Sequence, residues 1–114
     1  MAATDRFMRT RALLGEEKMS RLQQASVMII GLGAVGGYAL EALARAGIGH
    51  LILVDFDVFD ETNINRQILA LDSTVGRQKT AVAAERVKDI NPDCCVTLKN
   101  MVVNGDTLPQ LFCE

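Results

Sequence analysis

Two short apolar runs stand out along the chain and predict buried strands. They cover residues 27–30 and 51–54. Continuous apolar positions, rather than alternating ones, are typical of strands that are covered on both faces, as in a parallel sheet. A weaker apolar run at residues 95–98, continued at 101–103 beyond a bend at Asn100, indicates a third strand.

Helical periodicity fills the intervals between these runs. Residues 35–46 are rich in Ala and Leu, and they are followed by Gly47, a residue that commonly ends a helix. Residues 76–90 place their apolar side chains on one helical face, and the pair Asn91-Pro92 stops that helix. Two long helices are therefore expected, one after each of the first two strands.

The two ends of the chain are also expected to be helical. Residues 4–24 carry an excess of basic side chains, and Gly15 divides this segment into two short pieces. Near the other end, Asp106 is expected to cap a last helix that reaches Glu114. The polar residues 56–65 predict a loop that contains a helical turn.

This alternation of strands and helices predicts an α/β fold. The expected architecture is a Rossmann-like, mainly parallel sheet with flanking helices and right-handed crossovers. In the strand order three-two-one, the apolar strand at residues 27–30 lies at an edge, where a doubly wound sheet would have a fourth strand. The sequence therefore predicts an incomplete, truncated doubly wound domain, or one that a partner chain covers.

Composition narrows the class of protein without identifying a function. The chain has 114 residues, 49% of them hydrophobic, and a net charge of −2, which fits one globular domain without a bulk charge for nucleic-acid binding. No apolar run approaches the roughly 18 residues of a membrane-spanning helix, and no secretory signal is recognisable. The three cysteines form no Cys-x-x-Cys pair, which argues against a metal site and favours a cytoplasmic location.

A glycine-rich turn follows the first predicted strand and opens the first long helix. Gly31, Gly33 and Gly36 have the spacing G-x-G-x-x-G. The first glycine permits a tight turn, the second lets the backbone approach a phosphate, and the third lets helix and strand pack closely. Because free N–H groups and the helix dipole attract phosphate oxygens, we expect a nucleotide-binding domain over residues 26–114, preceded by a helical lead-in over residues 1–25.

Acidic residues follow the second predicted strand. Asp55 ends that strand and follows Gly31 by 24 residues along the chain. An acidic residue at about this spacing commonly accepts hydrogen bonds from ribose hydroxyls. Asp57 follows in the same loop and is a second candidate for the nucleotide site, with a solvated loop charge as the alternative. A nucleoside attached to the phosphates is therefore expected.

Polar and basic residues further along the chain distinguish between two kinds of nucleotide. Asn63, Arg66 and Gln67 lie in one short segment, and Lys79 lies in the first turn of the helix predicted at residues 76–90. A hydride-transfer dinucleotide needs little added positive charge, whereas a reacting triphosphate needs cations for the charge that moves onto pyrophosphate. Lys79 also opposes its own helix dipole, which a nearby anion would offset. These residues favour a nucleoside triphosphate.

Together these motifs resemble the ThiF/MoeB/HesA superfamily, which includes the ubiquitin-activating enzymes. The resemblance covers the chain from about Arg6 to its end, and the N-x-N-R-Q motif at residues 63–67 is its most specific part. Within the superfamily, this segment is most similar to the branch of tRNA threonylcarbamoyladenosine dehydratases.

The resemblance implies a role for each matching residue. It implies that the glycine turn holds the triphosphate of ATP, that the acidic loop holds the ribose, and that the polar and basic residues contact or support the phosphates. The residues concerned are Gly31, Gly33, Gly36, Asp55, Asp57, Asn63, Arg66, Gln67 and Lys79. Arg9 matches the arginine that dimers of this family insert into the neighbouring subunit's ATP site, so a homodimer is expected.

The resemblance also implies a reaction, the ATP-dependent adenylation of a carboxylate. The substrate is expected to be threonylcarbamoyladenosine in tRNA, which then cyclises with loss of water. The alternative is the C-terminal glycine of a ubiquitin-like sulfur-carrier protein. Mg²⁺ is expected to be bound by a residue beyond Glu114, so this chain alone is expected to be inactive.

Two functions of other classes stay open at this level. The glycine turn by itself also fits an NAD-binding oxidoreductase module, although Asn63, Arg66 and Lys79 disfavour it. A non-catalytic partner subunit is the other alternative. Inactive halves of heterodimeric activating enzymes typically lack phosphate-contacting residues, whereas this chain keeps them.

Overall fold

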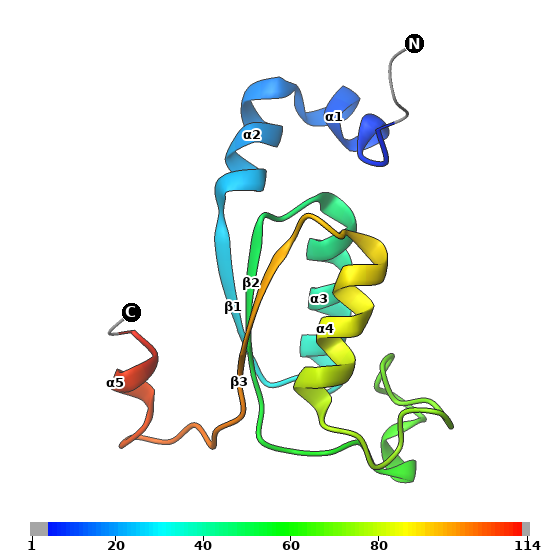
Figure 1. The fold of residues 1–114 in the computed structure, drawn as a ribbon, viewed down its shortest axis with the longest axis vertical. Coiled ribbons are helices and arrows are strands. Elements are labelled where there is room, and N and C mark those ends of the chain that lie inside the picture. Colours follow the sequence, from blue (N-terminus) through cyan, green and yellow to red (C-terminus); the bar gives the residue numbers. More distant parts are fainter. Residues whose placement is uncertain (1–4, 113–114) are drawn as a thin grey trace.

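Three parallel strands form the sheet of this protein in a computed structural model, which describes residues 5–112 (Figure 1). The strands are β1 (Ser26–Ile30), β2 (His50–Val54) and β3 (Cys95–Lys99), and β2 lies between the other two. Ile30 pairs with Val54, and Val54 pairs with Lys99, so the three strands end together at the carboxyl edge of the sheet. The expected Rossmann-like parallel sheet, with the first strand at an edge, is confirmed.

The helices α3 (Ala34–Ala46) and α4 (Lys79–Ile90) lie side by side and cover one face of the sheet (Figure 1). Between these layers, Leu40 from α3, Leu53 from β2 and Val87 from α4 are fully buried. Their burial supplies the main stabilisation of this unit, since a fully buried Leu or Val contributes about 1.5–3 kcal/mol.

Two short helices, α1 (Met8–Leu14) and α2 (Glu16–Gln24), precede the sheet and meet at Gly15, as the sequence predicts. They lie at the end of the sheet where the strands begin (Figure 1). Met19 of α2 is fully buried, and its Cε lies so near Gly47 that a Cβ on that glycine would meet it at 2.6 Å. The helical segment is thus packed against the end of α3.

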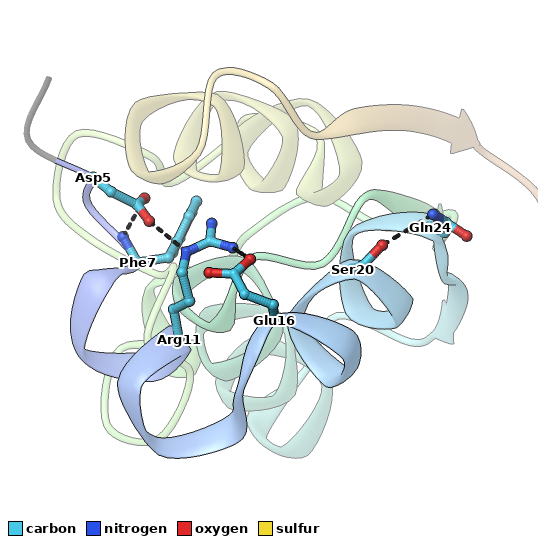
Figure 2. A network of polar contacts seen from close by, with 6 residues as sticks. All are labelled: Asp5, Phe7, Arg11, Glu16, Ser20 and Gln24. Carbon is cyan, nitrogen blue, oxygen red and sulfur yellow. Dashed lines mark hydrogen bonds and ion pairs between the residues drawn. The ribbon is translucent and has the colours of Figure 1, made fainter. Parts of the chain in front are cut away.

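Ion pairs fix the start of the helical segment (Figure 2). Arg11 donates from Nε to Asp5 Oδ2 at 2.9 Å and from Nη1 to Glu16 Oε2 at 2.8 Å. The N–H of Phe7 donates to Asp5 Oδ1 at 3.0 Å, and this hydrogen bond, with that from Arg11, lowers the pKa of Asp5. The division of the chain at residue 25 into a lead-in and a domain stays a prediction.

Two boundaries predicted from the sequence are wrong. α4 begins at Lys79 rather than at residue 76, because Gly76 has a φ of +86° and donates its N–H to Phe59 O at 2.7 Å. Residues 101–103 do not continue the third strand. β3 ends at Lys99, and the N–H of Met101 turns back to the carbonyl of Lys99 at 3.1 Å.

The last helix is also shorter than expected. α5 (Leu108–Leu111) is preceded by Thr107 as its N-cap residue. Asp106 does not cap the helix, because it lies in the preceding turn, where its N–H donates to Asn104 Oδ1 at 2.9 Å. Thr4 and Glu114, which bound the expected terminal helices, lie outside the described residues. No helix within residues 5–112 is long and apolar enough to cross a membrane.

Candidate functional site at the carboxyl edge of the sheet

The glycine turn connects β1 to α3 at the carboxyl edge. Gly31 has a φ of +94°, a conformation that favours glycine, and its N–H donates to Val54 O at 2.8 Å. Gly33 is the N-cap residue of α3; no side chain caps this end, and no acidic residue lies in the first turn. The positive end of the α3 dipole therefore has no charged partner on its own helix, which suits it to an anion.

Asp55 holds this turn to the loop that follows β2. Its Oδ2 accepts the N–H of Leu32 at 2.8 Å, and its Oδ1 accepts the N–H of Asp57 at 2.9 Å. Because a carboxylate has about four acceptor positions, two remain for ligand hydroxyls. Sequence reasoning predicted only the ribose-binding role of Asp55, and it missed this turn-holding role.

A hollow of about 150 Å³ opens beside Asp55 at the ends of the three strands. Its lining is largely apolar, from the ends of β1 and β2 and from the segment after β3. The lining residues are Ile30, Gly31, Val54, Asp55, Phe56, Met101, Val102 and Val103. Such a lining suits a flat, weakly polar group. A hydroxyl-bearing part of the same ligand could then donate hydrogen bonds to the carboxylate of Asp55.

The loop after β2 contains a short 3-10 helix, η1 (Glu61–Asn63), which fits the helical turn expected there. Asp60 caps it: its Oδ2 accepts the N–H of Thr62 at 2.9 Å, and hydrogen bonds from the side chain and backbone of Thr62 lower the pKa of Asp60. Asn63 completes the capping box, since its Oδ1 accepts the N–H of Asp60 at 2.8 Å. The amide Nδ2 of Asn63 is then the group that can donate to a phosphate.

The structure brings Gln67 to the glycine turn. Gln67 is only 7% exposed, and its Nε2 lies 3.8 Å from the position that a Cβ on Gly33 would take. Its Oε1 is buried without a hydrogen-bond partner among the described residues. A buried unpaired amide oxygen is unfavourable by about 1–3 kcal/mol, so a ligand donor near the turn would stabilise it.

Arg66 precedes Gln67 but keeps its side chain on its own loop. Its exposed guanidinium donates from Nη1 to Thr62 O at 3.0 Å and to Asn65 Oδ1 at 2.9 Å. Nε and Nη2 remain as donors. Among the described residues, Arg66 forms no hydrogen bond or ion pair with the glycine turn.

Lys79 is the first residue of α4 and is only 6% exposed. Its N–H donates to Asp57 O at 3.0 Å, and the N–H of Asp57 donates to Asp55, which in turn binds Leu32. This chain of hydrogen bonds connects Lys79 to the glycine turn. Its Nζ lies 5.4 Å from the centroid of the buried Phe59 ring. No carboxylate within residues 5–112 forms an ion pair with it.

Arg9 is not brought to this site. It is exposed on α1, and α1 lies at the end of the molecule where the strands begin, opposite the carboxyl edge (Figure 1). Nor do the described residues assemble a metal site, since no group of three or more His, Cys, Asp or Glu side chains is placed to hold an ion.

Nearly the whole chain matches one family, since the ThiF family profile covers residues 5–113. The tRNA threonylcarbamoyladenosine dehydratase of Bacillus subtilis (strain 168) is 43% identical over 106 residues, which cover 93% of this chain and 42% of that protein. The enzyme of the same name from Haemophilus influenzae is 51% identical over 82 residues, or 72% of this chain and 31% of that protein. The molybdopterin-synthase adenylyltransferase of Escherichia coli (strain K12) is 39% identical and covers 82% of this chain and 37% of its own.

Solved structures agree with these relatives. The crystal structure of E. coli tRNA N6-threonylcarbamoyladenosine dehydratase, TcdA, in complex with ATP has a TM-score of 0.91 and 42% identity, covering 97% of this chain and 47% of its own. E. coli MccB, in complex with AMPCPP and MccA, has a TM-score of 0.86 and 29% identity, covering 96% of this chain and 34% of its own. The chain spans less than half the length of each of these proteins.

Proposed function

Since the chain belongs to the ThiF family, we propose that it binds ATP at the glycine turn and serves the ATP-dependent adenylation of a carboxylate. We propose that this carboxylate is the one of threonylcarbamoyladenosine in tRNA. The relatives named tRNA threonylcarbamoyladenosine dehydratase support this substrate with 43% and 51% identity. The chain's similarity to a structure with bound ATP supports the nucleotide.

The observation that carries the proposal is the environment of Lys79. Lys79 is only 6% exposed as a residue, its Nζ lies 5.4 Å from the centroid of the Phe59 ring, and it has no carboxylate partner in residues 5–112. A cation without a counter-charge is unfavourable in the first turn of a helix, because it opposes the positive end of the helix dipole. A polyphosphate at the adjoining glycine turn would supply the missing negative charge.

The other residues of the site each bind a different part of the nucleotide. The glycine turn admits the phosphates, the two free acceptor positions of Asp55 take the ribose hydroxyls, and the apolar hollow beside it takes the base. Asn63 Nδ2 and Gln67 Nε2, which lies beside Gly33, are the amide groups that can donate to phosphate oxygens. Arg66 reaches the site once its two contacts on the loop are exchanged for phosphate oxygens.

In the reaction we propose, an oxygen of the carboxylate attacks the α-phosphorus of ATP. The bond between the α-phosphorus and the bridging oxygen breaks, and pyrophosphate leaves with the electron pair. Lys79, and Arg66 once its side chain has moved from the loop to the site, stabilise the negative charge that develops on the leaving group. Mg²⁺ on the triphosphate remains part of the proposal, with a ligand expected from outside the described residues.

Nucleotide titration tests this proposal. ATP should bind the full-length protein more tightly than NAD. The variants Lys79→Ala and Arg66→Ala should each lower adenylation by roughly 100-fold, because each removes a cation that we propose stabilises the leaving group. Lys18→Ala, at an exposed lysine on α2, is the matched control and should have no effect. Tighter binding of NAD would support the oxidoreductase alternative, and wild-type turnover in both variants would refute the assigned roles.

The assembly and the location belong to the same proposal. We propose a homodimer in which Arg9 of each subunit completes the site of the other, because α1 lies at the far end from its own glycine turn. A cytoplasmic location is supported by Cys94 and Cys95, which are both free.

A ubiquitin-like sulfur carrier remains the alternative substrate. The relative named molybdopterin-synthase adenylyltransferase, at 39% identity, favours it, although less strongly than the dehydratases favour tRNA. ATP–pyrophosphate exchange separates the two: we expect exchange that depends on tRNA carrying threonylcarbamoyladenosine. Exchange that depends instead on a carrier protein ending in glycine would replace the tRNA substrate and leave the adenylation chemistry intact.

A further inference from the structure

A buried hydroxyl joins the first turn of α4 to the point where the chain leaves β3. Thr80 follows Lys79 and is 1% exposed, and its Oγ1 donates a hydrogen bond to Oδ1 of Asn100. Asn100 directly follows Lys99, the last residue of β3. The contact therefore spans two elements that meet at the carboxyl edge, and it lies next to the lysine that carries the proposed function.

Asn100 begins the segment that forms one wall of the hollow beside Asp55. This segment, residues 101–103, belongs to none of the strands that the structure describes, so no strand pairing fixes its position. Its start is held by Thr80 through Asn100. At its centre, Val102 O accepts a hydrogen bond from Thr107 Oγ1 at 2.7 Å. Two threonine side chains, Thr80 and Thr107, thus fix the position of this wall by hydrogen bonds, in place of pairing with a neighbouring strand.

We propose that Thr80 is a positioning residue, whose hydroxyl holds Asn100 and so fixes residues 101–103 as the wall that the base of the bound nucleotide packs against. The inference rests on the proposed function, because it assigns the hollow to the nucleoside end of ATP. A preformed wall binds without first being ordered, whereas a loosened wall must lose conformational freedom when the base binds. Thr80 and Lys79 are adjacent in the first turn of α4. The Thr80 hydroxyl therefore also fixes the position of the wall for the base relative to the lysine proposed to face the phosphates.

Three variants separate this role from a general effect on folding. Thr80→Val keeps the buried volume and removes the hydroxyl, whereas Thr80→Ser keeps the hydroxyl. Asn100→Ala removes the acceptor from an exposed position and leaves the core unchanged. Thr97→Val is the matched control, since Thr97 is an exposed threonine of β3 whose Oγ1 pairs with His50 Nε2 at 2.8 Å, away from the hollow.

Isothermal titration of the full-length protein with AMP and with ATP tests the proposal. In Thr80→Val and in Asn100→Ala, the Kd of both nucleotides should rise by roughly fivefold, the change expected from one lost hydrogen bond. The ratio of the two Kd values should not change, because AMP and ATP share the base and the ribose. Thr80→Ser and Thr97→Val should bind like the wild type. The double variant Thr80→Val/Asn100→Ala should bind no more weakly than either single variant.

Several results would overturn the proposal. One is wild-type binding by Thr80→Val, or by Asn100→Ala where the first variant does not fold. Another is a loss of ATP binding much larger than that of AMP, which would place the damage at Lys79 rather than at the wall. Equal losses in Thr80→Ser and Thr80→Val would show that the hydroxyl is not the cause. A wild-type protein that binds neither nucleotide would instead refute the proposed function, and this inference with it.

Discussion

At the scale of single residues, Gly36 illustrates how little freedom the site has. It lies in the first part of α3, and a Cβ at this position would come within 1.8 Å of the carbonyl oxygen of Gly31 and 2.9 Å of its carbonyl carbon. Both atoms belong to the backbone of the glycine turn, so no side-chain rotation can relieve the clash. The third glycine of the motif is therefore a packing requirement that keeps the helix against the turn.

Replacement of this glycine tests that requirement. Gly36→Ala should lower the free energy of unfolding by roughly 2–4 kcal/mol and abolish ATP binding, because the turn must move away from α3. Gly105→Ala is the control, since nothing lies within 4 Å of a Cβ there and its φ is not in the left-handed region. Its effect should stay within about 0.5 kcal/mol. Urea-induced unfolding of the full-length protein measures both, and equal stabilities would show that the turn adapts.

At the scale of helices and strands, a buried carboxylate joins α3 to α4. Glu41 of α3 is 7% exposed; it accepts hydrogen bonds from Arg86 of α4 and, at 2.8 Å, from Arg45 of its own helix. Burial raises the pKa of Glu41, but the hydrogen bonds from Arg86 and Arg45 outweigh it, and the pKa is lowered below its ordinary value of 4.5. The carboxylate is thus ionised in the folded protein and stabilises the helix pair that carries the glycine turn and Lys79.

The pH dependence follows from the sign of this shift. A pKa that is lower in the folded state stabilises the fold above the ordinary value of 4.5, and this contribution is lost as the pH falls below it. Glu41→Gln should therefore lower the free energy of unfolding at pH 7 by about 1–2 kcal/mol, with the half-exposed arginines limiting the effect. The difference from the wild type should shrink as the pH falls below about 4.5.

A surface pair supplies the comparison for this experiment. Glu17 and Arg21 form an ion pair on α2 at 2.8 Å, with side chains that are 80% and 76% exposed. Glu17→Gln should change the free energy of unfolding by no more than about 0.5 kcal/mol at any pH. If Glu41→Gln behaved in the same way in urea titrations at pH 7 and pH 4, the α3–α4 ion pairs would contribute nothing measurable.

The elements themselves were largely predictable from the sequence, because they depend on local patterns. The apolar runs predicted the three strands, and the residues that end helices, such as Gly47, set their limits correctly. The boundaries at Gly76 and at residues 101–103 were not predictable. They depend on hydrogen bonds from Gly76 to Phe59 and from Met101 to Lys99, which form only once the loops have folded.

In the candidate site, too, the features set by local sequence were predictable and those set by contacts between distant segments were not. The glycine spacing predicted the turn, and the N-x-N-R-Q motif singled out Gln67, which the structure places beside Gly33. The roles of Gln67 and Lys79 in nucleotide binding stay predictions. The sequence gives no sign that Asp55 binds the N–H of Leu32, or that Thr80 reaches Asn100, since both contacts join segments more than a dozen residues apart. Contacts between loops depend on the assembled sheet rather than on local sequence.

At the scale of the whole molecule, the glycine turn and helix α1 lie at opposite ends of the sheet. The glycine turn and Lys79 lie at the carboxyl edge, whereas Arg9 lies on α1 beyond the start of the strands (Figure 1). None of the residues of α1 is buried, so this helix has a free surface for contact with another subunit. The role proposed for Arg9 therefore requires the ATP site of a second copy of the protein.

This arrangement can be tested by mixing two inactive variants and measuring how much activity returns in the mixed dimers. Arg9→Ala and Lys79→Ala should each remove most of the activity when assayed alone, because every site then lacks one cation. In a mixed dimer, one site receives Lys79 from the first subunit and Arg9 from the second, and the other site receives neither. Random mixing makes about half of the dimers mixed, so about a quarter of the wild-type activity should return. Mixtures that stay at the level of the separate variants, or an Arg9→Ala protein with full activity, would show that each site is complete within one subunit.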